Sequence, residues 1–346
     1  MIKKLLSTIT CLYFVILIAT VLHFSFTAVI VELIIGVCAI LCLAIGLFLN
    51  NRIKKTDWFR SAIPDINNYP TNDWYREHYT RNYDIVNIGS SSAKCAFNYS
   101  DLGIKAFNWA EQPQSLTYGY KVLKTYFSIL KNNGIVVISL GPFSGLDVDL
   151  KWAKDRNDKY YYILAPNLIF DYRRVAFRRR YPLFAYPIKS LKVIVKGLLC
   201  RSINNNDIDG NSNIFVDDAD KWLDEWLEEF NIKDIDAPLS DDNKASQSIR
   251  ISLLSDIITF CLQRNLRPVI VIPPMHPSLA LKFSNTFREN YIYSFVRKAN
   301  SAKIPFYNYM DDPRFSSDSY FKNAFLLNDV GAKHFTNILL KELNLI

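Results

Sequence analysis

Hydrophobic side chains form one long continuous run at the start of the chain and short, separated runs after it. Between residues 5 and 50, His23 and Glu32 are the only His, Lys, Arg, Asp or Glu side chains. As a helix rising about 1.5 Å per residue, this run is roughly 69 Å long, about twice a hydrocarbon core of about 30 Å. This length predicts a transmembrane hairpin with spans at residues 5–24 and 29–49. The run is also too long for a cleaved signal peptide. Glu32 then lies either near the lipid headgroups or, as a functional carboxylate, buried in the span.

Positive charges at both ends of the hairpin indicate its orientation. Lys3 and Lys4 precede the first span, and Arg52, Lys54 and Lys55 follow the second. Because positively charged flanks stay on the cytoplasmic side, two spans place both ends and the following domain in the cytoplasm. A single span would place that domain outside the cell, and the sequence leaves this alternative open.

Short apolar runs, bounded by polar residues or by Gly and Pro, recur through the rest of the chain. Because these runs are continuously apolar, they predict the strands of a parallel sheet that is buried on both faces. Helical periodicity lies between them, so the alternation predicts a doubly wound α/β/α domain of three layers, with its site at the carboxyl ends of the strands. The expected strands are Asp84–Gly89, Ile104–Trp109, Ile135–Leu140, Pro268–Ile272 and Ile304–Tyr307, and the expected helices are Ser115–Lys131, Ala245–Arg264, Phe287–Ala302 and Gly331–Leu343.

These patterns divide the chain into three expected parts. Residues 1–50 form the membrane anchor, and residues 51–80 form a juxtamembrane linker. Residues 81–346 form the α/β domain, and a charged insertion at about residues 150–240 interrupts its alternation of strands and helices.

The insertion separates its charges by sign, which the overall net charge of +8 conceals. Residues 151–201 hold 13 basic and three acidic side chains, whereas residues 207–242 hold 13 acidic and two basic ones. In the basic part, residues 172–186 interleave arginines with aromatic rings. Beside a membrane anchor this pattern favours a surface that binds anionic lipid, or else a segment that pairs with the acidic part or is solvated. Nucleic-acid binding is the least favoured interpretation.

Composition excludes several classes of protein. Half of the residues are hydrophobic and 14% are aromatic, which excludes a disordered chain. The six cysteines are far apart or within the spans and include no CxxC pair, so the sequence shows no disulfide scaffold, zinc motif or redox motif. We therefore expect no metal and no cofactor.

A serine-rich turn follows the first expected strand, in the sequence Ile88-Gly89-Ser90-Ser91. A serine in this turn is exposed at the carboxyl edge of the sheet, where the N–H groups that open the next helix can stabilise an oxyanion. Ser91 is therefore a candidate nucleophile, and Gly89 and Ser90 are candidate oxyanion or substrate-binding residues. Gly-Ser-Ser is also an ordinary turn and N-cap sequence, and this second interpretation stays open.

The turn resembles the first block of SGNH/GDSL hydrolases, with Gly89, Ser90 and Ser91 at the Gly-Asp-Ser positions. The far end of the chain is similar to the closing block of SGNH-like proteins of bacterial envelope and exopolysaccharide systems, which reads Asp-x-x-His-Leu-Asn-x-x-Gly-Ala-x-x-Phe-Thr. The resemblance spans about residues 80–346 and implies a flavodoxin-like fold, a bacterial inner-membrane location and deacylation or acyl transfer on a glycan. The residues of this chain that match the closing block are Asn328, Gly331, Ala332, Phe335 and Thr336.

Two catalytic positions of the family have diverged in this chain. In the family register, Asn323 occupies the position of the Asp and Leu326 that of the His. Asn has no charge to orient an imidazolium, and Leu cannot accept a proton, so such a loss costs about 10⁴–10⁶ in turnover. The family's Gly-x-Asn-Asp block is also missing, which leaves Asn108 and Gln112 as candidate oxyanion donors.

His276 is the histidine best placed to act as a substitute base. It follows the expected strand Pro268–Ile272 in a Pro-rich loop at the carboxyl edge of the sheet. Asp312 follows the next strand and could orient the imidazole. Alternatively, His276 serves in packing or in a backbone hydrogen bond, and Asp312 caps a turn.

The sequence thus leaves two functions open. The first is a membrane-anchored serine esterase or O-acyltransferase that acts on acylated envelope polysaccharide. The second is a catalytically degenerate SGNH-like domain that binds a glycan or a protein in a membrane polysaccharide assembly. Both imply membrane lipid, a glycan and other envelope-polysaccharide proteins as partners.

Overall fold

The computed structural model describes residues 10–18, 26–65, 69, 82–146, 157–199 and 213–346. The chain divides into two compact units, of which the smaller comprises residues 1–62 and 176–204 and the larger comprises residues 63–175 and 205–346. This division differs from the three expected parts, because part of the expected insertion groups with the N-terminal helices.

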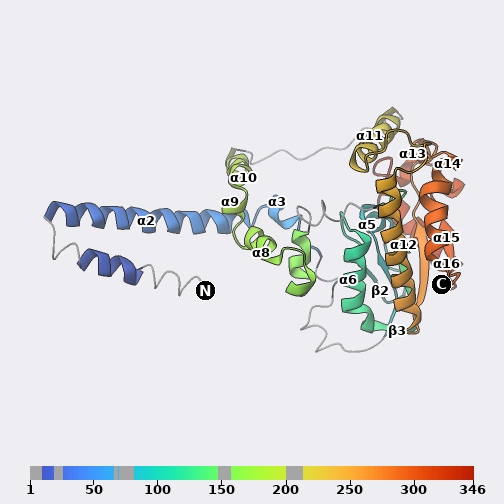
Figure 1. Cartoon of the computed structure of the whole chain (residues 1–346), viewed down its shortest axis with the longest axis horizontal. Helices are drawn as coiled ribbons and strands as arrows, with labels where there is room; N and C mark the ends of the chain where they lie inside the picture. Colours follow the sequence, from blue (N-terminus) through green and yellow to red (C-terminus); the bar gives the residue numbers. More distant parts are fainter. Residues whose placement is uncertain (1–9, 19–25, 66–68, 70–81, 147–156, 200–212) are drawn as a thin grey trace. The chain divides into compact units, whose positions relative to one another are not determined.

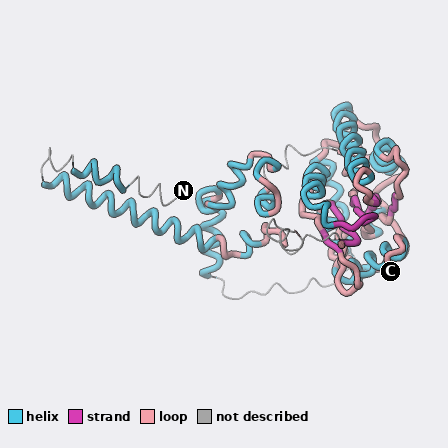
Figure 2. Tube along the Cα trace, turned by 90° about the horizontal axis from the view of Figure 1, so that it is seen from below, coloured by secondary structure: helices cyan, strands magenta, loops and turns pink. Residues whose placement is uncertain are grey.

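The larger unit is built on one parallel sheet of five strands in the order β2-β1-β3-β4-β5 (Figure 2). This confirms the predicted α/β class, and each expected run contributes to one strand. The order is one of the two common orders of doubly wound sheets, the one found in flavodoxin. The strands are β1 (Tyr83–Ile88), β2 (Ala106–Asn108), β3 (Leu130–Ser139), β4 (Arg267–Ile272) and β5 (Phe306–Asn308).

Alternate side chains of the central strands enter two separate hydrophobic cores. In β1, Ile85 lies in one core, whereas Val86 and Ile88 lie in the other. The same alternation places Val137 of β3 with Ile85, and both faces of the sheet are therefore covered. Asn87, which is fully buried, is the one polar residue among the four buried residues of β1.

Helices cover both faces of the sheet (Figure 1). The larger core receives α6 (Leu116–Tyr126), α12 (Asp241–Leu262) and α15 (Ser294–Ala299), and the smaller core receives α5 (Ser91–Ala96) and α16 (Asp329–Glu342).

Two predicted helices differ from those observed. The helix expected at Ser115–Lys131 ends at Tyr126, because a 3-10 turn at Phe127–Ile129 (η2) leads into β3 at Leu130. The helix expected at Phe287–Ala302 is interrupted by a π-helical turn. This region consists of α14 (Asn285–Phe287), η5 (Arg288–Tyr293) and α15.

The expected charged insertion is mainly helical. In the larger unit, α11 (Asn213–Glu229) packs on α13 (Pro277–Ala280). Residues 147–156 and 200–212 lie outside the described part of the chain. The observed elements are η3 (Asp158–Tyr162), η4 (Pro166–Leu168), α8 (Tyr172–Arg180), α9 (Pro182–Ala185), α10 (Pro187–Leu199) and α11 (Asn213–Glu229).

The smaller unit contains one helix that is long and apolar enough to cross a membrane, the segment Ile30–Ile53 of α2 (Phe26–Ile53). Its 24 residues correspond to about 36 Å of helix, which exceeds a hydrocarbon core of about 30 Å. Residues 10–18 form a second, shorter helix, and α3 (Asp57–Arg60) follows α2. The remainder of the first expected span and the turn between the spans lie outside the described residues, so the hairpin stays a prediction.

The segment that matches the closing block folds into the start of α16. Asn328 caps the helix, because its side-chain oxygen accepts hydrogen bonds from the N–H groups of Val330 and Gly331, both at 3.0 Å. Phe335 is fully buried in the smaller core. Gly331 is required because a Cβ at this position would collide with the carbonyl oxygen of Tyr320.

We expect Gly331→Ala to lower the free energy of unfolding by about 1–3 kcal/mol, the range for overpacking, although alanine is the better helix former. Gly141→Ala is the matched control, since a Cβ there would lie 3.8 Å from Ser144 Oγ in ordinary contact. Chemical denaturation of the detergent-solubilised chain measures both. Equal stabilities of the two variants would contradict this assignment.

Candidate functional site

The serine turn lies at the carboxyl end of β1, where the order of the sheet reverses between β1 and β3. Gly89 has a φ of +153°, and a Cβ there would lie 3.0 Å from the carbonyl oxygen of Ser139 in β3, so glycine is required. Ser90 is the N-cap of α5, and Ser91 opens the helix and is half-buried. Within the described part of the chain, the Ser91 hydroxyl has no hydrogen-bond partner.

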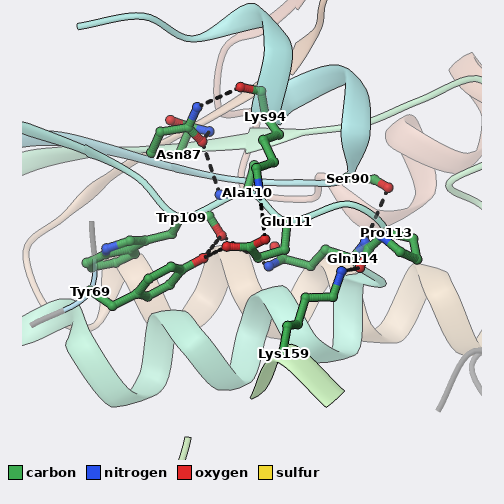
Figure 3. A network of polar contacts seen from close by, with 11 residues as sticks. Tyr69, Asn87, Ser90, Lys94, Trp109, Ala110, Glu111, Pro113, Gln114 and Lys159 are labelled. Atoms are coloured by element: carbon green, nitrogen blue, oxygen red, sulfur yellow. Dashed lines mark hydrogen bonds and ion pairs between the residues drawn. The ribbon is translucent and has the colours of Figure 1, made fainter. Parts of the chain in front are cut away.

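Gln114 fixes the serine turn from the segment after β2. Its side-chain Oε1 accepts a hydrogen bond from the Gly89 N–H at 3.1 Å. The backbone N–H of Gln114 donates to Ser90 Oγ at 3.3 Å (Figure 3). The side chain of Gln114 is buried, whereas that of Gln112 is exposed. The sequence identified Gln112 as the candidate in this segment, and the residue that contacts the turn is Gln114.

Asn108 links β2 to β1 and α5. Its Oδ1 accepts a hydrogen bond from Asn87 Nδ2 at 2.7 Å, and its Nδ2 donates to the carbonyl oxygens of Lys94 at 3.1 Å and Phe97 at 3.0 Å. Asn87 in turn accepts a hydrogen bond from the Tyr99 hydroxyl at 3.0 Å. The amide group of Asn108 is thus engaged in holding the fold, and its predicted oxyanion role has no support from these contacts.

Glu111 is a buried carboxylate next to the same turn, with only 5% of its side chain exposed. It accepts hydrogen bonds from Lys94 Nζ at 2.8 Å and from the Tyr69 hydroxyl at 2.9 Å (Figure 3). Burial, together with the nearby Glu111 carboxylate, raises the pKa of Tyr69 well above its ordinary value. The sequence interpretation overlooked Glu111, because an acidic residue after a strand gives no sign of burial.

His276 is held by residues other than those predicted. Its Nε2 lies 2.9 Å from Asp318 Oδ1 and its Nδ1 lies 2.7 Å from Ser278 Oγ, while its ring stacks on Phe215 at 4.4 Å between centroids. With the Asp318 carboxylate as acceptor, Nε2 carries the proton, and Nδ1 accepts from the Ser278 N–H. The single proton of the Ser278 hydroxyl can reach either Nδ1 or the Phe215 carbonyl oxygen, which lies 3.0 Å from Oγ. These contacts fix the loop after β4.

Asp312 also has a local partner. Its carboxylate accepts hydrogen bonds from Arg314 Nε at 2.9 and 3.1 Å and caps the 3-10 turn Pro313–Phe315 (η6). This hydrogen bonding lowers the pKa of Asp312. Among the described residues, no hydrogen bond or ion pair joins Ser91, His276 and Asp312, so the predicted catalytic roles remain predictions without a connected triad.

The diverged family positions have structural roles. Asn323 Oδ1 accepts hydrogen bonds from the N–H groups of Phe325 at 3.0 Å and Leu326 at 2.8 Å, which closes a turn. Leu326 is 5% exposed and belongs to the larger core. The neighbouring Ala324 carbonyl accepts a hydrogen bond from the His276 N–H at 3.0 Å. A turn-forming amide and a core leucine therefore occupy the positions at which the family places its acid and base.

A polar groove of about 860 Å³ lies beside α5 and the start of α16. Neither Ser90, Ser91 nor His276 lines it. Lys322 and Asp329 are exposed at its edge and make no side-chain hydrogen bond or ion pair with other described residues. Its polar lining includes Asp65, Lys94, Cys95, Asn98, Tyr99, Ser100, Asn108, Glu111 and Asn328.

Among the described residues, no group of three or more His, Cys, Asp or Glu side chains is arranged to hold a metal ion. No family model matches the chain, and no curated protein matches it. The assignment of function therefore depends on the geometry of this edge of the sheet.

We expect Cys95, as the single remaining cysteine, to react slowly with iodoacetamide at neutral pH. Burial raises the pKa of its thiol above the ordinary value of 9.0, so the midpoint of the rate against pH lies above that value. Lys322 lowers this pKa and Asp329 raises it, so Lys322→Ala slows alkylation and Asp329→Asn accelerates it at a fixed pH. Lys333→Ala is the control. A midpoint below 9 would contradict the buried position.

Proposed function

We propose that the α/β unit is an SGNH-like domain without a working hydrolytic triad, and that it binds glycan as a component of a membrane-bound polysaccharide assembly. The observation that carries this proposal is the isolation of Ser91, whose hydroxyl has no described base within hydrogen-bonding distance. His276, the candidate substitute, is held by Asp318 and Ser278. A serine hydroxyl without a base is a weak nucleophile.

Retention of the closing block alongside loss of the acid and base supports this proposal. Asn328, Gly331 and Phe335 each serve the fold, as a helix cap, a close backbone approach and a core side chain. Thr336 Oγ1 donates to the Ala96 carbonyl at 3.2 Å and accepts from the Asn98 N–H at 2.9 Å, which joins α16 to the end of α5. The residues that stabilise the domain match the closing block of the family. Asn323 and Leu326 differ from it at the two positions where the family residues serve catalysis rather than the fold.

The polar groove supports a glycan as the ligand. Sugar hydroxyls both donate and accept hydrogen bonds, and the groove offers amide, hydroxyl, ammonium and carboxylate groups. Lys322 and Asp329 have no described side-chain partner, so they are available to a ligand without breaking an ion pair. Tyr99, which is partly exposed, adds aromatic surface to the lining, on which a sugar ring can stack.

The anchor is proposed as a two-helix hairpin in a bacterial inner membrane. The helix of residues 10–18 lies beside α2 in both views of the chain (Figures 1 and 2), and the Tyr13 hydroxyl donates to the Glu32 carbonyl at 2.7 Å. The Tyr13 ring also fills the space beside Gly36. Two spans with basic residues at both ends place the α/β unit on the cytoplasmic side.

We expect no labelling of Ser91 by a fluorophosphonate probe in the folded, detergent-purified chain. Without a base, reactivity falls by about 10⁴–10⁶ relative to an intact triad. An active SGNH esterase is the positive control, and gel fluorescence is the readout. Labelling that disappears in Ser91→Ala would overturn the proposal in favour of an esterase or O-acyltransferase.

We expect oligosaccharides released from bacterial envelope polysaccharide to bind the purified chain, and Ser91→Ala to bind them equally well. Lys322→Ala should weaken binding, and Ser100→Trp, which fills the groove from an exposed position, should weaken it further. Lys333→Ala is the matched control, since this exposed lysine of α16 pairs with Asp101 outside the groove. Microscale thermophoresis measures the affinities. Affinities unchanged in both groove variants would exclude this groove as the binding site.

A further inference from the structure

An exposed amphipathic helix, α10, lies beside the charged end of α2 within the smaller unit. Ile188, Leu191 and Val195 are 72%, 51% and 51% exposed, and their spacing places them on one face of the helix. Each is followed directly by an exposed lysine, at positions 189, 192 and 196. An apolar stripe therefore runs along α10 with a row of cations at its border.

Buried polar contacts fix α10 to the last turns of α2. Asn50 of α2 is 2% exposed, donates to the Arg180 carbonyl at 3.0 Å and accepts from the Leu183 N–H at 3.2 Å. Leu183 belongs to α9, and the buried Ser190 of α10 donates to the Pro182 carbonyl of the same short helix at 3.0 Å. The apolar stripe is thereby held near the end of the membrane-crossing helix.

Two aromatic side chains of the kinds found at membrane interfaces, Trp58 and Tyr186, lie beside the start of α10. The Trp58 ring packs edge-on against Tyr186 at 6.0 Å between centroids. Lys189 Nζ lies 5.2 Å from the centre of the Trp58 ring. Trp and Tyr are enriched at the headgroup level of membranes, because each ring has an apolar body and a polar edge.

The arginine cluster, which the sequence suggested for lipid binding, partly serves the fold instead. Arg178 and Arg179 are 5% and 6% exposed. The Arg179 guanidinium lies 3.8 Å from the centre of the Phe59 ring and donates to the Phe59 carbonyl at 3.3 Å. The three lysines of α10, in contrast to these two arginines, are exposed.

We propose that α10 lies in the headgroup region of an anionic bilayer leaflet, with its apolar stripe inserted and its lysines on the lipid phosphates. This inference rests on the proposed membrane anchor. Lipid is the occupant because α10 contacts α2, whose own apolar side chains are exposed, and because Arg52, Lys54 and Lys55 add positive charge at the same end of that helix. By the positive-inside rule, this is the cytoplasmic leaflet.

The test uses the full chain without native cysteines, reconstituted in nanodiscs of phosphatidylcholine and phosphatidylglycerol. Leu191→Cys carries an environment-sensitive NBD label, and Leu281→Cys, 83% exposed on the α/β unit, is the control. We expect the label at residue 191 to be blue-shifted, quenched by nitroxide lipids of shallow depth, and quenched several-fold less by aqueous iodide than the label at residue 281. Near-UV circular dichroism verifies that both variants are folded.

Two outcomes would overturn the proposal. Iodide quenching at residue 191 equal to that at residue 281 means that α10 is in water. Shielding from both iodide and nitroxide lipid means that protein covers the stripe, either the chain's own α/β unit or a second copy. A label at Ile40→Cys, on the exposed apolar surface of α2, tests the anchor separately. If α2 spans the membrane, nitroxides placed deep in the lipid acyl chains quench this label. Quenching at residue 40 without quenching at residue 191 rejects the interfacial helix and leaves the anchor standing.

The contribution of charge is measured with the triple variant Lys189→Gln, Lys192→Gln and Lys196→Gln. In the parent chain, replacing phosphatidylglycerol by phosphatidylcholine should increase iodide access at residue 191. Phosphatidylcholine has no net charge, so the bilayer surface loses the negative charge that attracts the lysines of α10. The triple variant should lose this dependence on lipid composition. The exposed lysines at positions 298, 303 and 341 of the α/β unit, changed to Gln together, are the control and should retain it. A triple variant that keeps the full dependence overturns the role of the lysines.

Discussion

Burial of a parallel sheet on both faces is the constraint on which the α/β unit depends. Residues 85–88 of β1, 135–139 of β3 and 268–272 of β4 are buried on both faces of the sheet, so their side chains are apolar except for Asn87 and Ser139. Helices must then cover both faces, and polar chemistry is confined to the ends of the strands. The order of the sheet brings the serine turn after β1 next to the end of β3, at the position where doubly wound folds place their sites.

The polar groups at this edge mainly satisfy one another. Asn87, which is fully buried, could not stay in β1 without the amide of Asn108 and the hydroxyl of Tyr99 as partners. Glu111 is tolerated beneath the turn because Lys94 and Tyr69 both donate to it. Such a closed network stabilises the loops strongly but leaves few groups free to act on a substrate. This is the physical basis of our proposal that the domain binds a ligand rather than hydrolysing one.

The smaller unit is organised by a single amide side chain. Asn50 lies at the end of α2, and by donating to one backbone group and accepting from another it holds the chain between α8 and α9 against α2. A buried amide without these partners would be costly. Its contacts join residues separated by more than 100 positions in the sequence. They also explain why residues 176–204 group with residues 1–62 rather than with the α/β unit.

The amino-acid pattern by itself determined the class of the fold and the positions of the five strands, because these depend on local periodicity and burial. It predicted two membrane spans, and the described residues contain one helix of that length. That Gly89 must be a glycine was decided by its close approach to β3 in the folded sheet. Helix boundaries such as Tyr126 were missed where tertiary contacts start a strand early. The site was only partly predictable: Ser91 stands at the predicted edge, but the partners of His276 proved to be Asp318 and Ser278. Glu111 and Gln114 were not identified as site residues. Hydrogen bonds between distant segments decide such partners, and no spacing along the chain encodes which polar groups meet once the loops have folded.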